Sequence, residues 1–267
     1  MTVGTRTRTA TAVRNGAGRL DGTVAIVTGG SQGIGEAISR RFAAEGARVA
    51  IVNRRANVAA RVVGEIVDAG GEAQAFPADV ADVTAVRNAV AAIAARWGRI
   101  DILVNNAGVM IGQPIEAITE ADWQYQIDVN LKGVLFLTQA VVPIFKKNGG
   151  GKIINIGSIF GHDGYPAASV YCATKGALEL LTKSLCLELR EHHINVNCLG
   201  PGFIATPLNE SFRDDHAFNR VAAGRFGGPN LWMQPDELTG TAVYLASSDS
   251  DSVNGVTLYV DRGWSAY

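Results

Sequence analysis

The sequence contains few of the residues that would mark several classes of protein. Its 3 cysteines, at positions 172, 186 and 198, form neither a disulfide framework nor a CxxC metal pattern, and its 4 histidines form no HExxH or HxH cluster. We therefore expect no metal site. The net charge of -1 lacks the basic excess expected of a protein that binds nucleic acid. No run of 18 apolar residues is present, so we expect no membrane span and no membrane partner.

The first 20 residues differ in composition from the rest of the chain. They hold four arginines, five threonines and no acidic residue, as a transit peptide would, but no apolar face recurs at helical spacing. We predict a disordered extension over residues 1–20 and one domain over residues 21–267. No apolar signal-peptide core opens the chain, and we expect the protein to be cytoplasmic.

What the chain does have is glycine, 31 of 267 residues, and a regular alternation of two segment types. Short β-branched apolar runs predict strands, and Ala-rich segments with apolar residues three or four apart predict helices. The alternation predicts one doubly wound α/β fold, a seven-stranded parallel sheet buried by helices on both faces. The predicted strands are 24–28, 49–52, 73–77, 100–104, 152–156, 194–198 and 256–260, and the predicted helices are 35–44, 58–69, 83–97, 123–145, 170–190 and 235–246.

A long irregular stretch interrupts this rhythm near the C-terminus. Residues 201–235 are rich in Gly and Pro and also carry Arg and His. Long irregular insertions in compact domains are usually functional lids, so we predict a substrate lid here.

A glycine-rich turn follows the first predicted strand. It reads Thr28-Gly-Gly-Ser-Gln-Gly-Ile-Gly35, with the spacing GxxxGxG, and a predicted helix follows it. Glycines let a backbone approach a pyrophosphate closely, and the free amides of a helix N-terminus attract its charge. A tight loop without a ligand is the alternative. A P-loop is disfavoured because no Lys-Ser/Thr pair follows the last glycine.

The end of the second predicted strand indicates which dinucleotide binds. Asn53, Arg54 and Arg55 stand where a carboxylate would hold a ribose 2′-hydroxyl and repel a 2′-phosphate. Guanidinium groups suit a phosphate in both geometry and charge. We therefore predict NADP(H) as the preferred cofactor, with NAD(H) as the alternative.

A set of polar residues indicates catalysis. Tyr171 and Lys175 are four residues apart in a predicted helix and so share one face. Ser158 lies just after the fifth predicted strand, at the sheet edge where this fold binds ligands. Asn130, followed by Gly133, is a polar residue within a long apolar helix that it would weaken.

Together these residues resemble the short-chain dehydrogenase/reductase family of oxidoreductases, with its Rossmann-type fold. The resemblance covers about residues 20–264 and runs in order through Thr28–Gly35, Asp79, Asn105–Gly108, Asn130, Ser158, Tyr171 with Lys175, and Pro201-Gly202. It implies hydride transfer between NADP(H) and a carbonyl or secondary alcohol, and commonly a homotetramer. One departure is Arg262, where the family commonly has glycine, which places local packing or assembly in doubt more than the chemistry.

The resemblance also implies roles for individual residues. Tyr171 is the acid in reduction and the base in oxidation, and we expect a lowered phenol pKa because Lys175 and an oxidised nicotinamide are both positive. Ser158 holds the carbonyl oxygen, and Asn130 opens the helix to a water that links Lys175 to solvent. The expected catalytic residues are Asn130, Ser158, Tyr171 and Lys175. The expected cofactor-binding residues are Gly29, Ser31, Gln32, Gly33, Ile34, Gly35, Asn53, Arg54, Arg55, Asp79, Val80, Asn106, Ala107, Gly108, Tyr171, Lys175, Pro201, Gly202, Ile204 and Thr206.

The substrate is less clearly indicated. Candidates beside the site are Ser158, His162, Tyr165, Phe203 and Leu208, which suit a polyol, a sugar acid or a small ketone. Residues 224–227 and 235–238 are similar to those of sugar dehydrogenases in the family and equally to those of 3-oxoacyl carrier-protein reductases, which remain an alternative. A cofactor-binding regulator without catalysis is an alternative of another class, and the presence of Ser158, Tyr171 and Lys175 speaks against it.

Overall fold

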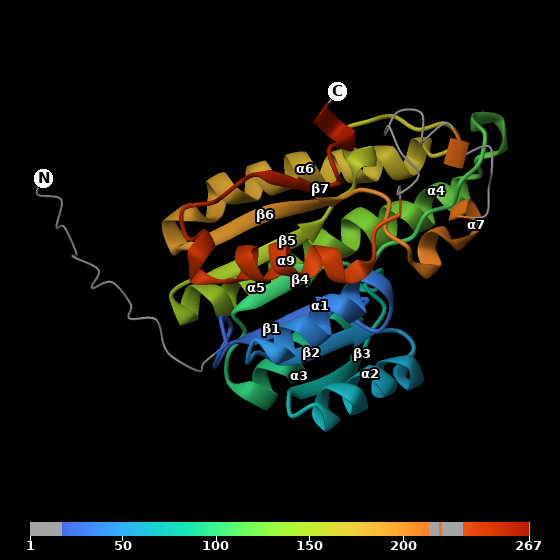
Figure 1. The fold of residues 1–267 in the computed structure, drawn as a ribbon. Coiled ribbons are helices and arrows are strands. Elements are labelled where there is room, and N and C mark those ends of the chain that lie inside the picture. The colour runs from blue at the N-terminus through green and yellow to red at the C-terminus, as the bar shows by residue number, and fades with distance from the viewer. Residues whose placement is uncertain (1–17, 214–218, 221–231, 267) are drawn as a thin grey trace, which may run out of the picture.

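The computed structural model describes residues 18–213, 219–220 and 232–266. Seven parallel strands form one sheet in the order β3-β2-β1-β4-β5-β6-β7, as Figure 1 shows. The doubly wound sheet predicted from the sequence is therefore confirmed. The strands are β1 (Val24–Thr28), β2 (Arg48–Asn53), β3 (Glu72–Pro77), β4 (Ile102–Asn105), β5 (Gly151–Ile156), β6 (Ile194–Pro201) and β7 (Thr257–Val260).

Helices cover both faces of this sheet. Residues of α1, α2 and α9 join one hydrophobic cluster with one side of the strands, and residues of α3, α5 and α6 join a second cluster with the other side. In Figure 1, α1 and α9 lie in front of the sheet. The helices are α1 (Gly33–Ala44), α2 (Ala56–Asp68), α3 (Val83–Trp97), α4 (Glu120–Ile127), α5 (Gly133–Asn148), α6 (Ser169–Leu189), α7 (Glu210–Arg213) and α9 (Thr239–Ala246).

Local sequence explains where α3 starts and stops. The Asp82 side chain accepts hydrogen bonds from the backbone amides of Thr84 (2.8 Å) and Ala85 (3.1 Å) and so caps α3. Gly98 ends α3 with φ 74°, a left-handed conformation that glycine adopts without steric cost. The predicted range 83–97 matches α3 because both signals stand in the sequence.

Three predictions about individual elements were wrong. The helix expected over 123–145 is two helices, α4 and α5, joined by one π-helical turn at Asp128–Lys132. The helix expected from 235 begins as a 3₁₀ turn, Pro235–Leu238. Strands β3 and β7 are not buried on both faces, because each lies at an edge of the sheet with one neighbouring strand.

The N-terminal boundary also differs from the prediction. Leu20, assigned to the extension, is 1% exposed and belongs to the core, and its amide donates to the Glu45 carbonyl over 2.9 Å. Residues 18–20 are thus part of the folded unit. The predicted extension over residues 1–17, and residues 214–218 and 221–231 of the predicted lid, lie outside the described residues.

One helical stretch, Glu120–Asn148, is long and apolar enough to cross a membrane by length and composition alone, as core helices of soluble proteins also are. Within it, Leu137, Val141 and Phe145 are at most 1% exposed and pack in the core. Packing in the core therefore explains the apolar character of these three positions.

The strand order places a topological switch point between β1 and β4. The chain leaves β1 toward one face of the sheet and β4 toward the other, which opens a crevice at the carboxyl ends of these strands. The glycine-rich turn after β1 and the Asn106–Gly108 segment after β4 both lie there.

Candidate active site

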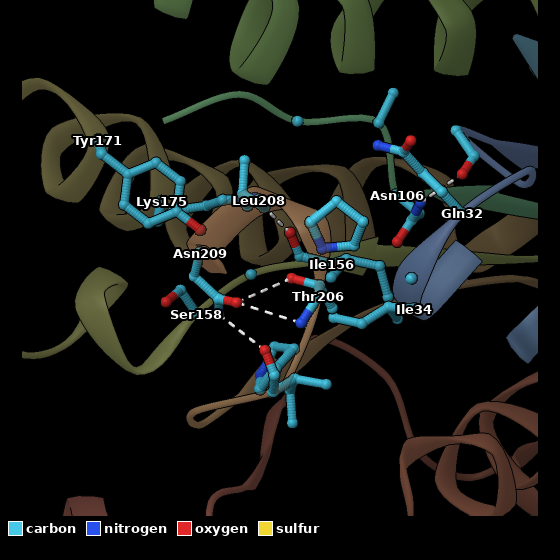
Figure 2. A pocket seen from close by; sticks show the side chains of 18 of the residues that line it. Gln32, Ile34, Asn106, Ile156, Ser158, Tyr171, Lys175, Thr206, Leu208 and Asn209 are labelled. Atoms are coloured by element: carbon cyan, nitrogen blue, oxygen red, sulfur yellow. Dashed lines mark hydrogen bonds between the residues drawn. The ribbon is translucent and has the colours of Figure 1, made fainter. Parts of the chain in front are cut away.

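Three neighbouring cavities lie along the carboxyl edge of the sheet. The central cavity, drawn in Figure 2, runs between the glycine-rich turn, β5, α6 and the segment after β6. A second cavity, lined by Arg54 and Arg55 at the ends of β2 and β3, adjoins the central cavity and is called the arginine cavity. A third, lined by Phe160, Phe203 and Trp232, also adjoins the central cavity and is called the aromatic cavity. The central and arginine cavities share Gly29, Gln32, Ala107 and Gly108, while the central and aromatic cavities share Ser158, Tyr171, Gly202, Leu208 and Asn209.

The glycine-rich turn is held against the loop after β4. The Asn106 side-chain amide donates to the Thr28 carbonyl over 2.8 Å, and the Thr28 hydroxyl accepts from the Asn106 backbone amide over 3.0 Å. Gly29 and Gly33 have φ of 63° and 54°, which favours glycine at both positions. A Cβ on Gly35 would lie 2.4 Å from both the Asn106 Nδ2 and the Gly29 carbonyl oxygen. The turn therefore keeps its shape only with these glycines.

The start of α1 offers free backbone donors to the central cavity. The N-cap residue of α1, Gln32, makes no side-chain capping hydrogen bond, and Gln32, Gly33 and Ile34 line the cavity. The first amides of a helix have no partners within it, and they attract anions. These donors and the glycine backbone fit the pyrophosphate of a dinucleotide.

The catalytic residues predicted from the sequence meet in the central cavity, with one exception. Ser158 follows β5, and Tyr171 and Lys175 lie one turn apart on α6, with all three lining the cavity (Figure 2). The Lys175 ammonium donates to the Ile156 carbonyl over 2.7 Å and lies 5.5 Å from the centre of the Tyr171 ring. Asn130 is fully buried behind this wall.

Asn130 anchors the segment that follows β4. Its side chain accepts from the Val109 amide and donates to the Val109 carbonyl, both over 2.8 Å, and it also donates to the Thr174 hydroxyl over 3.2 Å. The π-helical turn that contains Asn130 interrupts the helix that the sequence predicted to be continuous and weakened at this residue. Asn130 thereby ties the segment after β4 to α6.

Burial sets the protonation of the two titratable groups on α6. Tyr171 is 7% exposed, and burial raises the pKa of its phenol to about 12, against a hydrogen bond with Ser158 that lowers it. Lys175 is 4% exposed, and burial lowers the pKa of its ammonium to about 8. The lowered phenol pKa expected from the sequence is thus wrong for the chain by itself, because the burial that disfavours the phenolate outweighs the hydrogen bond with Ser158 that favours it.

The arginine cavity gathers the residues expected to hold the adenosine. Arg54 donates to the Tyr125 hydroxyl over 3.2 Å and to the Asp79 carboxylate over 3.4 Å, and Arg55 donates to the Gln32 side chain. The other oxygen of Asp79 accepts from the Ala81 amide over 2.9 Å. Asn53 and Val80 also line this cavity. Both arginines therefore line a cavity that also contains Gly29 and Gln32 of the glycine-rich turn.

Not every predicted residue lines a cavity. Ser31 is buried behind the turn, where its hydroxyl accepts from the Asn53 side chain, and Gly35 supports the turn from within. The exposed His162 lies with its ring 6.0 Å from that of Tyr259 and lines none of the three cavities. The remaining cofactor candidates, Pro201, Gly202, Ile204 and Thr206, line the central cavity beside Ala107 and Gly108.

The aromatic cavity holds the other substrate candidates together with residues the sequence did not single out. Tyr165 stacks on Phe160 at 4.7 Å between ring centres, and Phe203 packs edge-on against Phe160 (5.9 Å) and Trp232 (5.6 Å). Phe160 and Trp232 were missed because single aromatic residues in irregular segments carry no spacing signal. Asn209, also missed, lines both the central and the aromatic cavity.

Comparison with known proteins agrees with this geometry. Residues 23–217 match the short chain dehydrogenase family. The chain belongs to the short-chain dehydrogenase/reductase family. It is 38% identical to gluconate 5-dehydrogenase of Gluconobacter oxydans over 91% of this chain and 95% of that one. It is 36% identical to 3-oxoacyl acyl-carrier-protein reductase of Thermotoga maritima over 92% of this chain and 98% of that one.

Solved structures of this family are similar along nearly the whole chain. A gluconate 5-dehydrogenase from Burkholderia cenocepacia in complex with NADP and tartrate superposes with a TM-score of 0.89 and 41% identity, covering 93% of this chain and 98% of the other. A 3-ketoacyl acyl-carrier-protein reductase from Brucella melitensis with NADH superposes with a TM-score of 0.84 and 37% identity, covering 92% and 99%. This family member is therefore an NAD(P)-dependent oxidoreductase that acts on alcohols and carbonyls.

Proposed function

We propose that the protein interconverts a ketone and a secondary alcohol with NADP(H), at the junction of the central and aromatic cavities. The observation that supports this most directly is the placement of Ser158, Tyr171 and Lys175 in one cavity with the glycine-rich turn. When bound, the cofactor supplies or accepts the hydride. The substrate is a polyol, a sugar acid or a small ketone.

Ser158, Tyr171 and Lys175 each have a different role at the substrate oxygen. The Ser158 hydroxyl donates a hydrogen bond to the carbonyl oxygen, and this bond strengthens as negative charge develops there. Tyr171 gives its phenol proton to the same oxygen in reduction and takes it back in oxidation. A phenol with a pKa raised to about 12 is fully protonated at neutral pH, which suits it to the role of acid. Lys175 offsets the charge of the phenolate that forms.

The cofactor lies along the central and arginine cavities in this proposal. The backbone at Gly29, Gly33 and Ile34 holds the pyrophosphate, and Thr206 holds the nicotinamide carboxamide. Asp79 and Asn106 face the adenosine, and Asn130 fixes the segment beside it. Arg54 and Arg55 face the 2′-phosphate, which favours NADP(H) over NAD(H) because a guanidinium matches a phosphate in charge and geometry.

The Tyr171→Phe variant tests the reaction. Removing only the hydroxyl keeps the ring in its packed site, so we expect turnover to fall at least about 100-fold while the unfolding temperature changes little. Reduction of ketones is followed by loss of NADPH absorbance, and folding by thermal denaturation. Full turnover in the variant would contradict the assignment of Tyr171 as the acid.

A substrate panel separates the main proposal from its alternatives. A 3-oxoacyl carrier-protein reductase is the second candidate, since relatives with that name and with sugar-acid names are almost equally similar to the chain. Preference for an acetoacetyl thioester over gluconate and small ketones would favour it. Tight binding of NADPH without turnover of any panel member would favour a regulator.

We also propose a homotetramer in the cytoplasm, with residues 201–235 as the substrate lid. Leu180 and Leu187 on α6 are 68% and 63% exposed, and Leu135 on α5 is 40% exposed. Apolar side chains gathered on neighbouring helices support a subunit interface there. All three cysteines are free thiols, which supports a reducing compartment.

A further inference from the structure

The substrate must sit where the central and aromatic cavities meet. A carbonyl oxygen that accepts hydrogen bonds from Ser158 and Tyr171 places its carbon at this junction, since both residues line both cavities. Groups attached to that carbon then extend along the other residues of the junction, Gly202, Leu208 and Asn209. Asn209 alone among these three has a polar side chain.

Two backbone groups fix the orientation of the Asn209 amide. The Thr206 backbone N–H can only donate, and it points at the Asn209 Oδ1 over 3.1 Å. The Ile204 carbonyl can only accept, and the Asn209 Nδ2 donates to it over 2.7 Å. The Thr206 hydroxyl also lies 3.3 Å from the Oδ1. The Oδ1 of Asn209 therefore already accepts hydrogen bonds from Thr206, and the bond to Ile204 identifies the other amide atom as Nδ2 and fixes its position.

One donor of Asn209 remains for a ligand. An amide nitrogen carries two hydrogens, and the Ile204 carbonyl takes one. Within the described ranges 18–213, 219–220 and 232–266, no second acceptor bonds to this nitrogen. Figure 2 shows the Asn209 side chain between Ser158 and Thr206. A donor that loses water when substrate enters costs free energy unless the substrate supplies an acceptor.

The surroundings restrict what that acceptor is. Phe160, Phe203 and Trp232 form apolar walls of the aromatic cavity, and the Trp232 indole N–H donates to the Asn219 side chain over 2.9 Å. No Lys, Arg or His lines this cavity among the described residues. A carboxylate would lose its hydration there without a cationic partner, whereas a neutral oxygen needs one donor.

We propose that Asn209 determines specificity by donating a hydrogen bond to an oxygen on the carbon next to the reacting carbonyl. Neutral α-hydroxy ketones, and the vicinal diols formed from them, are then preferred to simple ketones, secondary alcohols and α-keto acids. This inference rests on the proposed function. A ketone, NADPH and one proton become a secondary alcohol and NADP⁺, and the neighbouring hydroxyl is unchanged by the reaction.

The experiment compares two ketones that differ by one hydroxyl. The full-length protein is assayed with NADPH on 2-hydroxycyclohexanone and on cyclohexanone, before and after Asn209→Ala. We expect kcat/KM to fall about tenfold for the hydroxy ketone and less than about twofold for cyclohexanone. The NADPH dissociation constant, measured by fluorescence, is expected to stay within about twofold.

Two further variants separate this role from helix capping. Asn209→Asp keeps an acceptor oxygen for Thr206 and removes both Nδ2 hydrogens, so the same selective loss is expected. Leu208→Ala changes an apolar side chain at the same junction and should affect both ketones by the same factor. Equal losses on both ketones for the Asn209 variants, or no loss, would overturn the preference. Turnover of neither ketone by the unaltered protein would overturn the proposed reaction with it.

Discussion

At the scale of single residues, the site depends on burial more than on charge. Tyr171 and Lys175 are both nearly inaccessible to solvent, and burial moves their pKa values in opposite directions, each toward the neutral form. A protonated phenol is ready to donate a proton at neutral pH. As the pH rises, the Lys175 ammonium loses its proton before the Tyr171 phenol does.

This order of titration predicts the pH dependence of reduction. Burial lowers the pKa of Lys175 to about 8, so its positive charge is present below pH 8 and is lost above it. Without that charge, the phenolate formed on Tyr171 is less stable. We expect kcat/KM for ketone reduction by NADPH to be level near pH 6–7 and to fall above pH about 8. In Lys175→Arg, whose guanidinium stays charged, the fall should move to higher pH; an unchanged profile would contradict this assignment.

Arg54 offers a second test at this scale. Its guanidinium is held beside Asp79 and Tyr125, within the cavity that the proposal assigns to the adenosine 2′-phosphate. Arg54→Ala should raise the KM for NADPH about tenfold and leave the KM for NADH within about twofold, because a charge-assisted hydrogen bond to phosphate is lost. Arg96→Ala, at an exposed arginine on α3, serves as the matched control and should change neither constant.

At the scale of elements, the turn after β1 and the π-helical turn before α5 shape the site. The first is kept by glycines that touch the loop after β4, and the second brings Asn130 against Val109 and Thr174. Both act by bringing backbone segments close together. The first therefore depends on the absence of side chains at its glycines, and the second on the hydrogen bonds of the Asn130 amide.

Two Gly→Ala variants compare a crowded position with an open one. At Gly35 a Cβ would lie 2.4 Å from backbone and side-chain atoms, so Gly35→Ala should lower the free energy of unfolding by about 1–3 kcal/mol. At Gly64, exposed within α2, nothing lies within 4 Å of a Cβ, so Gly64→Ala should raise it by about 0.5–1 kcal/mol. Urea unfolding measures both. Equal effects would show that space around Gly35 is not what requires glycine.

At the scale of the whole molecule, α6 serves two purposes. One face carries Tyr171 and Lys175 into the central cavity, and Leu180 and Leu187 are exposed on the same helix. The proposed tetramer would bury these leucines. Assembly and catalysis would then share one rigid element.

The exposed leucines make the assembly testable. Leu180→Glu would place a charge in an apolar interface, and we expect light scattering to show a smaller species than the tetramer of the unaltered protein. Val67→Glu, at a position 52% exposed on α2, is the control and should leave the mass unchanged. A tetramer that survives Leu180→Glu would place the interface elsewhere, and a monomeric unaltered protein would refute the tetramer.

The departure at Arg262 illustrates a feature that the sequence raised and the structure placed. Arg262 has φ 54°, a left-handed conformation that costs a non-glycine residue about 1–2 kcal/mol. Its guanidinium pairs with the Glu237 carboxylate over 2.8 Å, which links the end of β7 to the 3₁₀ turn before α9. The sequence showed only that Arg262 stands where the family commonly has glycine, and the structure shows that its φ is positive.

By itself the sequence determined the fold class, the glycine-rich turn and the grouping of Ser158, Tyr171 and Lys175. Apolar periodicity, glycine spacing and the four-residue separation on a helix are local signals, and parallel strands bring their carboxyl ends to one edge. These features can be predicted from the sequence because they depend on geometry within a few residues and on the rule that ligands bind at the carboxyl ends of parallel strands.

Only the tertiary structure decided the rest. The raised phenol pKa of Tyr171, the aromatic cavity and the junction at Asn209 depend on segments more than 20 residues apart in the chain that pack together. Burial and close contact are properties of that packing, and no local pattern encodes them. The reaction class can therefore be predicted from motifs, whereas protonation and substrate preference require the arrangement of side chains around them.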